Sequence, residues 1–197
     1  MVRALVIHAH PLSDGFSAAL FSTAVDALLA GGHEVRSHQL YQEGFAAAMS
    51  PAEHHAYHTD TPIISDEIQQ HADDLLWAQA LVFIYPTWWA GLPAILKGWL
   101  ERVMVPGVAF AFDEKSGKVK ANLGNITHLV GISTYGSARW SNWITGDGGS
   151  RTTLRALRML CPLRTRTRWF GLYRMDSCTP SDRTAFLAKV SSGMRTL

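Results

Sequence analysis

The side chains with the clearest capacity for chemistry lie in a short turn, where Trp88 and Trp89 stand between Pro86 and Gly91. The turn follows the apolar run Leu81–Ile84, which is typical of a buried strand. Indole faces stack on flat rings, and the N–H groups of a turn stabilise negative charge that develops on such a ring. We therefore interpret the turn as the binding site of a planar redox-active ring such as isoalloxazine.

A second candidate site is the segment His8–Leu20, which follows the first apolar run and opens a helix. Free N–H groups at a helix start attract anions, and the hydroxyls of Ser13 and Ser17, together with His10, add contacts for phosphate oxygens. An ordinary Ser/Asp helix cap is the alternative interpretation. The segment contains neither GxGxxG nor a GxxxxGKS/T loop, so a classical dinucleotide or nucleoside triphosphate site is not supported.

The third candidate is the loop "STYGSARW", residues 133–140, at the end of another apolar run. Gly136 allows the backbone to approach a ring closely, and Tyr135, Arg139 and Trp140 are expected to wall the pocket above that ring. We take Arg139, and Tyr135 through its hydroxyl, as candidate catalytic or substrate-binding groups. An exposed arginine on a loop and plain packing of the tyrosine ring are the alternatives.

Strands and helices alternate along the chain and position these loops. Strands are expected at residues 3–9, 33–40, 81–85, 126–134 and 166–173, and helices at 17–32, from a Ser65 cap onward, at 92–105, at 151–160 and from 181 to the end. Residues 41–62 are expected to be irregular. This alternation predicts a single α/β domain, residues 1–197, with a five-stranded parallel sheet in the flavodoxin-like order 2-1-3-4-5 and helices on both faces. In that order the loops after strands one and three are neighbours.

Composition narrows the function classes. The chain has 197 residues, 47% hydrophobic and 17% charged, with a formal net charge of +2, an excess too small to indicate nucleic-acid binding. Apolar runs are too short to span a membrane, and the N-terminus lacks a signal-peptide pattern, so a cytoplasmic protein is expected.

His54, His55 and His58 lack partners at metal-binding spacing, so we expect no metal. Six arginines between 151 and 168 are interpreted as a solvated basic face, with phosphate or partner binding as the alternative.

Several motifs resemble one known family. They are Ala9-His10-Pro11 with Phe16-Ser17, the run from Pro86 to Val103 with its "PAILKGW" block, and Thr179-Pro180 followed by Asp182. These resemble the NAD(P)H:quinone oxidoreductase family, which includes the DT-diaphorase type, bacterial quinone reductases and ancillary subunits of potassium-efflux systems. The resemblance implies a flavodoxin-like fold, a bound flavin, usually FAD, and a homodimer with its active sites at the subunit interface.

The resemblance also implies roles for individual residues. Cofactor phosphates and ribityl would be held by His10, Phe16, Ser17 and Ala18, the isoalloxazine by Pro86, Thr87, Trp88, Trp89 and Ala90, and its flanks by Ser133, Thr134, Tyr135 and Gly136. The animal enzymes also place a Tyr and a His over the flavin. Those two positions fall here at Arg139 and Thr145 in one register and at Ser141 and Asp147 in the other, and neither register supplies a Tyr and a His.

The function expected from the sequence is a flavin-dependent NAD(P)H oxidoreductase. It would pass hydride from NADPH or NADH to a quinone, nitroaromatic or similar acceptor by a ping-pong mechanism. FAD is favoured over FMN by resemblance, and the segment from Thr179 to Arg183 is expected to form part of an adenosine pocket. Two alternatives remain, a regulatory flavoprotein subunit of a potassium-efflux type transporter and a flavodoxin-like electron carrier.

Overall fold

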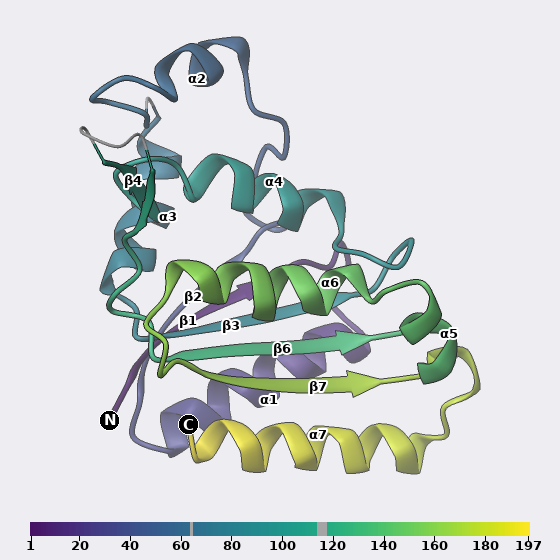
Figure 1. The fold of residues 1–197 in the computed structure, drawn as a ribbon. Helices are drawn as coiled ribbons and strands as arrows, with labels where there is room; N and C mark the ends of the chain where they lie inside the picture. The colour runs from purple at the N-terminus through teal and green to yellow at the C-terminus, as the bar shows by residue number, and fades with distance from the viewer. Residues whose placement is uncertain (64, 114–117) are drawn as a thin grey trace.

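Five parallel strands form the central sheet in the order β2-β1-β3-β6-β7 (Figure 1). The computed structural model describes residues 1–63, 65–113 and 118–197. The topology matches the predicted order 2-1-3-4-5, because β6 and β7 are the fourth and fifth strands of this sheet. The strands are β1 (Arg3–His8), β2 (Glu34–Gln39), β3 (Ala80–Pro86), β6 (His128–Thr134) and β7 (Arg166–Leu172).

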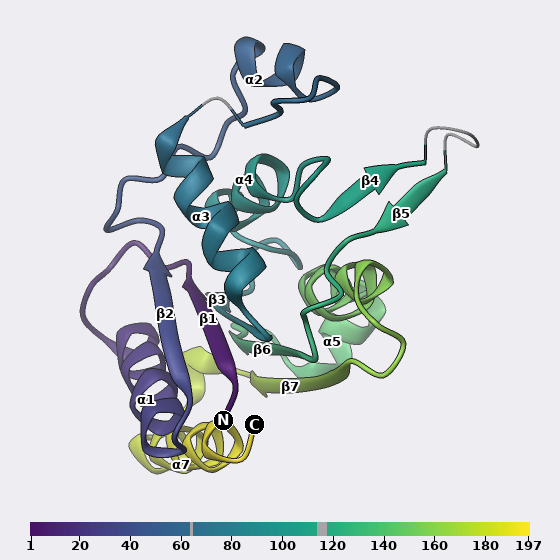
Figure 2. The ribbon, with the colours of Figure 1, turned by 90° about the vertical axis from the view of Figure 1, so that its left-hand side faces the viewer.

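The numbering skips because a small antiparallel hairpin, β4 (Phe110–Phe112) and β5 (Val119–Ala121), precedes β6. Figure 2 shows this hairpin projecting away from the central sheet. It was not predicted, because strands of three residues are too short to show an alternating pattern.

Alternate residues of each central strand face two separate apolar cores. One core packs β-strand residues such as Leu81 and Phe83 against α3 (Asp66–Trp77) and α4 (Ala94–Val103). The other packs residues such as Val82 and Ile84 against α1 (Phe16–Ala30) and α7 (Pro180–Arg195), which lie together on the opposite face in Figure 1. The three-layer arrangement follows from this burial. No helix of the described residues combines the length and apolar character needed to cross a bilayer.

Local signals explain where the main helices begin and end. Ser65 accepts a hydrogen bond from the N–H of Ile68 at the start of α3, and Thr179 and Asp182 form a capping box at the start of α7. Helix α1 ends at the predicted Gly31-Gly32 stop, where Gly32 takes φ 77°.

Three segments differ from the sequence-based expectation. The stretch expected to be irregular contains a short helix, α2 (Pro51–Ala56), and a helix α5 (Arg139–Ile144) begins inside the expected third loop. The helix expected at 151–160 begins earlier, as α6 (Gly148–Ser150), and continues as a π-helical turn, η1 (Arg151–Ala156), and a 3-10 segment, η2 (Leu157–Leu160). Hydroxyls of Thr152 and Thr153 donate to carbonyls four residues earlier, a contact that bends helices.

Arg102 of α4 fixes the segment between β2 and α2. Its Nη2 lies 2.6 Å from Oε1 of Glu53, and its Nη1 donates to the carbonyl of Ala46. The guanidinium also lies over the ring of Phe45, with its carbon 5.2 Å from the ring centroid. Both partners of the ion pair are largely buried, with side-chain exposures of 7% and 12%. The pair therefore joins two parts of the chain that are far apart in sequence.

An indole packs directly onto the backbone of a central strand. A Cβ added to Gly131 of β6 would lie 2.1 Å from Cζ3 of Trp169 on neighbouring β7. The same indole contacts the rings of Tyr85 and Tyr135, with centroids 6.3 Å apart in each case. Only glycine at 131 leaves room for this ring.

Candidate functional site

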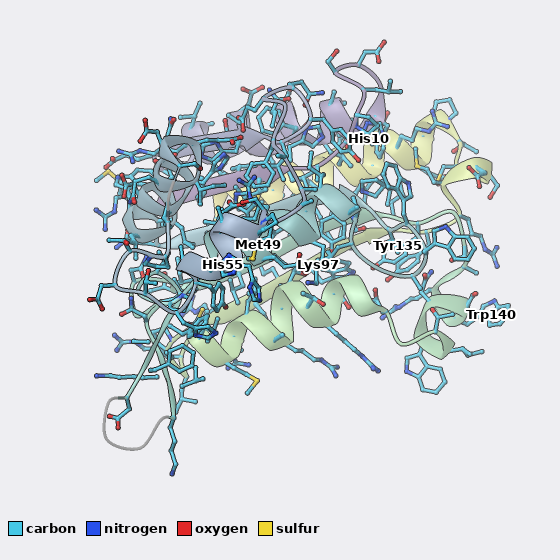
Figure 3. All side chains as sticks on the ribbon, turned by 90° about the horizontal axis from the view of Figure 1, so that it is seen from above. His10, Met49, His55, Lys97, Tyr135 and Trp140 are labelled. Carbon is cyan, nitrogen blue, oxygen red and sulfur yellow. The ribbon has the colours of Figure 1, made fainter. Side chains whose placement is uncertain are left out.

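The three candidate loops meet at the carboxyl edge of the sheet. The N–H of Ala9 donates to the carbonyl of Ile84 over 2.9 Å, which joins the loop after β1 to β3. Thr87 joins the loop after β3 to β6, because its hydroxyl lies 2.8 Å from that of Ser133. Figure 3 shows His10, Tyr135 and Trp140 along this side of the molecule. The predicted meeting of the first two loops is therefore confirmed, and this edge is where α/β proteins of this topology bind ligands.

The tryptophan turn has a strained backbone. Trp89 and Ala90 both lie in the left-handed region, at φ 49° and 56°, and the N–H of Gly91 donates to the carbonyl of Trp88. Two consecutive left-handed residues define a type I′ turn, which normally uses Asn and Gly. Each non-glycine residue in this region costs roughly 1–2 kcal/mol. Strain of this size is found at functional sites, where surrounding structure maintains it.

The turn presents the groups that a flat ring requires. Trp88 is 41% exposed and Trp89 is fully exposed. The N–H groups of Trp89 and Ala90 make no hydrogen bond to any described residue, whereas the carbonyl of Ala90 accepts from the N–H of Gly148 over 3.0 Å. Two free main-chain donors and two indole faces therefore lie together in a turn whose position is fixed by α6. This arrangement fits the edge of an isoalloxazine ring.

The first turn of α1 is open to an anion. Gly15 is its N-cap at φ 86°, without a side-chain cap, and the first turn holds no acidic residue. The N–H groups of Phe16, Ser17 and Ala18 therefore have no partner in the described part of the chain. Together with the positive end of the helix dipole, they fit a phosphate group.

A buried histidine orients the hydroxyl of Ser17. Nε2 of His8 lies 3.0 Å from Oγ of Ser17, and burial, with the nearby His10, lowers the pKa of His8 to about 4. The neutral ring and the hydroxyl therefore hold each other in place at the start of α1, and which of the two donates depends on the tautomer of His8.

His10 lies between the two loops. Its Nδ1 accepts a hydrogen bond from the N–H of Leu12 over 3.2 Å, and its ring centroid lies 6.4 Å from that of Trp88. The imidazole is half-buried. This bond leaves Nε2 as the ring nitrogen available to a ligand, in keeping with the predicted contact to the cofactor.

Tyr135 lies beneath the site and is 1% exposed, although the sequence suggested a place on the pocket wall. Its hydroxyl donates to Oδ1 of Asp147 over 3.0 Å, and its ring stacks on Tyr173 with centroids 4.5 Å apart. Burial and the Asp147 carboxylate hold the pKa of Tyr135 far above its ordinary value, so the hydroxyl stays protonated. Any effect of Tyr135 on a substrate therefore passes through Asp147, which lies at φ 42°.

Arg139 and Trp140 border a groove at the same carboxyl edge of the sheet, which we call the α5 groove. It has a volume of about 600 Å³ and is lined by Ala138, Arg139, Trp140, Trp143, Tyr173 and Arg174. Sequence reasoning identified Arg139 and Trp140 but missed Trp143, Tyr173 and Arg174. No local pattern marks them, since Tyr173 and Arg174 follow a different strand and reach the groove only through the pairing of β6 with β7.

The other predicted site residues lie around these features. Ser133 is fully buried and Thr134 is half-buried, whereas Gly136 is exposed, with Oδ2 of Asp176 3.4 Å from the Cβ that a side chain there would have. Pro86 ends β3 and pairs with Thr134 in the sheet register.

A cluster of histidines and carboxylates lies elsewhere, between β2 and α3. His38, Glu43 and His71 hold ligand atoms within 4.8 Å of one another, a spacing that suits a metal. However, the indole N–H of Trp99 donates to Nδ1 of His71, so Nε2 of that neutral ring carries a proton and is not a ligand. Both nitrogens of His38 face carboxylates, with Nδ1 3.3 Å from Glu43 and Nε2 2.8 Å from Asp74. The cluster therefore holds a proton on His38.

Residues 2–161 match a protein family described as having a flavodoxin-like fold. An uncharacterized NAD(P)H oxidoreductase of Haemophilus influenzae is 35% identical over 122 residues, covering 61% of this chain and 58% of that protein. NAD(P)H dehydrogenase [quinone] 1 of Rattus norvegicus is 32% identical over 150 residues, covering 68% of this chain and 54% of that protein. The chain thus spans a little over half the length of these curated relatives.

A solved structure shares the fold over its whole length. The FMN-dependent NADH-azoreductase of Bacillus anthracis, in complex with FMN, superimposes with a TM-score of 0.75 at 16% identity and covers 100% of this chain and 99% of that one. At this identity the likeness establishes the fold alone. Together with the match over residues 2–161 and the identity to the rat enzyme, the strained aromatic turn and the open helix start lead to one assignment. The chain belongs to the NAD(P)H:quinone oxidoreductase family of flavodoxin-like proteins.

Proposed function

We propose that this protein is a flavin-dependent NAD(P)H oxidoreductase that reduces a quinone, a nitroaromatic compound or a similar acceptor. The observation that carries the proposal is the tryptophan turn, whose strained residues Trp89 and Ala90 present free N–H donors beside exposed indoles. The enzyme class follows the names of the relatives, an NAD(P)H oxidoreductase and an NAD(P)H dehydrogenase [quinone]. The flavin follows the fit of the site and the FMN present in the azoreductase of the same fold.

The chain's own groups bind and orient the cofactor. The first-turn N–H groups of α1, from Phe16 to Ala18, and the Ser17 hydroxyl would hold its phosphates together with His10. Residues Pro86 to Ala90 and Ser133 to Gly136 would hold and flank the ring, and the free N–H groups of the turn would stabilise its electron-rich form. A flavin bound there supplies hydride transfer from a nicotinamide to an acceptor. Because both substrates use one open face of the site, ping-pong kinetics are expected.

We favour FAD as the cofactor, with FMN as the alternative. A cavity of about 510 Å³ lies between the end of β7 and the start of α7, and its wall includes Tyr173, Cys178 and Phe186. The ring of Phe186 lies 6.5 Å from that of Phe16, at the open start of α1. A ligand with phosphates at α1 therefore has room for an adenosine in this cavity. Asp182, which belongs to the segment expected to form part of an adenosine pocket, also lines the cavity, and this supports the proposal.

Two residues are proposed to act on the substrate. Arg139 is exposed beside the site, and we assign it the role of a substrate-binding cation. Tyr135 is a positioning residue, because its buried hydroxyl holds the Asp147 carboxylate. In one of the two registers Asp147 falls at a position where the animal enzymes of this family carry a Tyr or a His, and neither register supplies that pair. Proton delivery to a reduced acceptor is therefore expected to come from solvent.

A homodimer with its active sites at the subunit interface is part of this proposal, as are a single flavin-binding domain over residues 1–197 and a cytoplasmic location. The fully exposed indole of Trp89 lies at the site and is suited to burial by a second copy. No specific observation favours the two alternatives, a regulatory subunit of a potassium-efflux type transporter and a flavodoxin-like electron carrier.

The test begins with the purified protein, incubated with FAD or FMN and desalted. A yellow protein that is bleached by NADPH or NADH and regains its colour with menadione supports the proposal, and the mass of the ligand released on heating identifies FAD or FMN. Parallel lines in double-reciprocal plots would support ping-pong kinetics. A protein that stays colourless with both flavins would refute the proposal. A flavoprotein that no nicotinamide reduces would point to the electron-carrier alternative.

A further inference from the structure

The α5 groove carries an aromatic surface with no internal partner. Trp140 and Trp143 are three residues apart on α5, so their side chains share one face of the helix. They are 66% and 79% exposed. Two large indoles exposed to water on one short helix mark a binding surface rather than a structural one. Tyr173 adds a third ring, which is held in place by its stacking on buried Tyr135.

The same groove carries unpaired positive charge. Arg139 and Arg174 line it, and neither guanidinium makes a hydrogen bond or ion pair with any described residue. A guanidinium remains charged at all physiological pH values, and its flat fork binds carboxylate, sulfonate or phosphate groups while stacking on aromatic rings.

Nearby acidic groups do not cancel this charge within the groove. The Asp147 carboxylate accepts the Tyr135 hydroxyl, and Asp176 lies beside Gly136. Neither residue is part of the groove lining. The lining therefore combines aromatic rings with two cations and contains no anion.

We propose that the α5 groove binds the electron acceptor, and that this acceptor is a flat aromatic molecule carrying a negatively charged substituent. The inference rests on the proposed function, which supplies the reaction, and it adds the chemical class of the acceptor. A volume of about 600 Å³ accommodates a fused three-ring compound. In one register Arg139 occupies a position where related enzymes place a Tyr or a His, so this chain offers a cation where those enzymes offer a neutral donor.

The test compares two acceptors with the same ring system. Anthraquinone-2-sulfonate is anionic and 2-(hydroxymethyl)anthraquinone is neutral, and each is titrated into the purified protein by calorimetry and by quenching of tryptophan fluorescence. We expect the sulfonate to bind about 10-fold more tightly. The double variant Arg139→Gln/Arg174→Gln should lose this preference while binding the neutral compound as before. Trp143→Ala should weaken the binding of both compounds.

A matched control removes the same charge elsewhere. Arg164→Gln/Arg195→Gln changes two exposed arginines outside the groove and should keep the preference for the sulfonate. Equal binding of the two anthraquinones, or a preference that survives the loss of Arg139 and Arg174, overturns the proposal. If the double variant weakens NADPH binding and leaves sulfonate binding unchanged, the groove holds a nucleotide phosphate and the acceptor assignment is wrong.

The two proposals fail separately. A flavin-loaded protein that reduces the neutral anthraquinone but shows no preference for the sulfonate refutes the inference about the groove alone. A protein that binds no flavin yet prefers the sulfonate through Arg139 and Arg174 refutes the proposed function alone.

Discussion

Nδ1 of His71 accepts a hydrogen bond from the buried indole N–H of Trp99 over 3.2 Å. This contact fixes the tautomer of His71, whose ring centroid lies 3.8 Å from that of His38. His71 stays neutral, and its pKa falls to about 4 through burial and the nearby charge of His38. His38 is the charged partner, because the carboxylates of Glu43 and Asp74 outweigh the effect of burial and raise its pKa above 6.5.

The charged His38 should make stability depend on pH. Because its folded-state pKa is raised above the unfolded value of 6.5, its contribution is complete below pH 6.5 and is lost as pH rises through the folded-state pKa. We expect the free energy of unfolding of the native protein, minus that of His38→Gln, to fall as pH rises from 6 to 9. Urea denaturation across this range measures it. The exposed variant His54→Gln should track the native protein, and a flat difference would refute the assignment of charge to His38.

His71 should make the free energy of unfolding depend on pH below 6.5. Its folded-state pKa of about 4 lies below 6.5, so protons favour the unfolded state and stability falls as pH drops from 6.5 toward 4. The loss is of order 1 kcal/mol between pH 6.5 and 5. Direct titration of the His71 ring by NMR checks this prediction. A His71 midpoint near 6.5 would contradict it.

The strain in the tryptophan turn predicts opposite effects of one substitution. Ala90→Gly removes a left-handed alanine at φ 56°, so the flavin-free protein should gain roughly 0.5–1 kcal/mol in stability after the entropy of glycine is included. Flavin binding should weaken, because the turn loses its rigidity. Chemical denaturation and flavin titration measure the two effects. The control Ala188→Gly, on an exposed face of α7, should instead lose about 1 kcal/mol and bind flavin normally.

A negative charge at the start of α1 should raise the stability of the flavin-free protein and lower its affinity for flavin. Ala18→Asp places a carboxylate in a first turn that contains no acidic residue, so the flavin-free helix should gain roughly 0.5 kcal/mol. The same carboxylate repels the cofactor phosphates, and flavin affinity should fall by about 10-fold or more. Ser22→Asp makes the same charge change one turn later and should leave affinity nearly unchanged. If both variants bind flavin equally well, the phosphates do not lie at α1.

The two ion pairs of α4 should differ widely in importance. Glu53→Gln leaves the buried Arg102 without its counter-charge and should cost roughly 3 kcal/mol of stability. Lys97→Ala removes an exposed pair with Glu101 and should cost under about 0.5 kcal/mol. Thermal unfolding of both variants gives the comparison. Faster proteolysis between Phe45 and Ala56 in Glu53→Gln would show that the lost stability is local to that segment.

Local patterns predicted β1, β3 and β6, because burial on both faces makes these strands nearly continuous apolar runs. The Gly31-Gly32 stop and the Ser65 cap were also correct, because helix ends depend on residues adjacent in the sequence. The three loops of the site were predicted, because each is a run of adjacent residues. The left-handed conformation of the tryptophan turn was not predicted, because Trp89-Ala90 lacks the Asn-Gly signal of type I′ geometry.

Contacts between residues that are distant in sequence could not be predicted from local patterns. The burial of Tyr135 depends on Asp147 and Tyr173, and the proton of His38 depends on Asp74 of α3. Each partnership is created by the packing of separate strands and helices.

The indole that covers the bare backbone of Gly131 has a consequence for how this protein diverges over time. Any side chain at position 131 would meet the ring of Trp169 on the adjacent strand, so position 131 must stay glycine while Trp169 is kept. The two positions should therefore evolve as a pair. A homologue with a bulkier residue at the first position should carry a smaller one at the second, and such joint exchanges would reveal the adjacency of β6 and β7 in any alignment deep enough to record them.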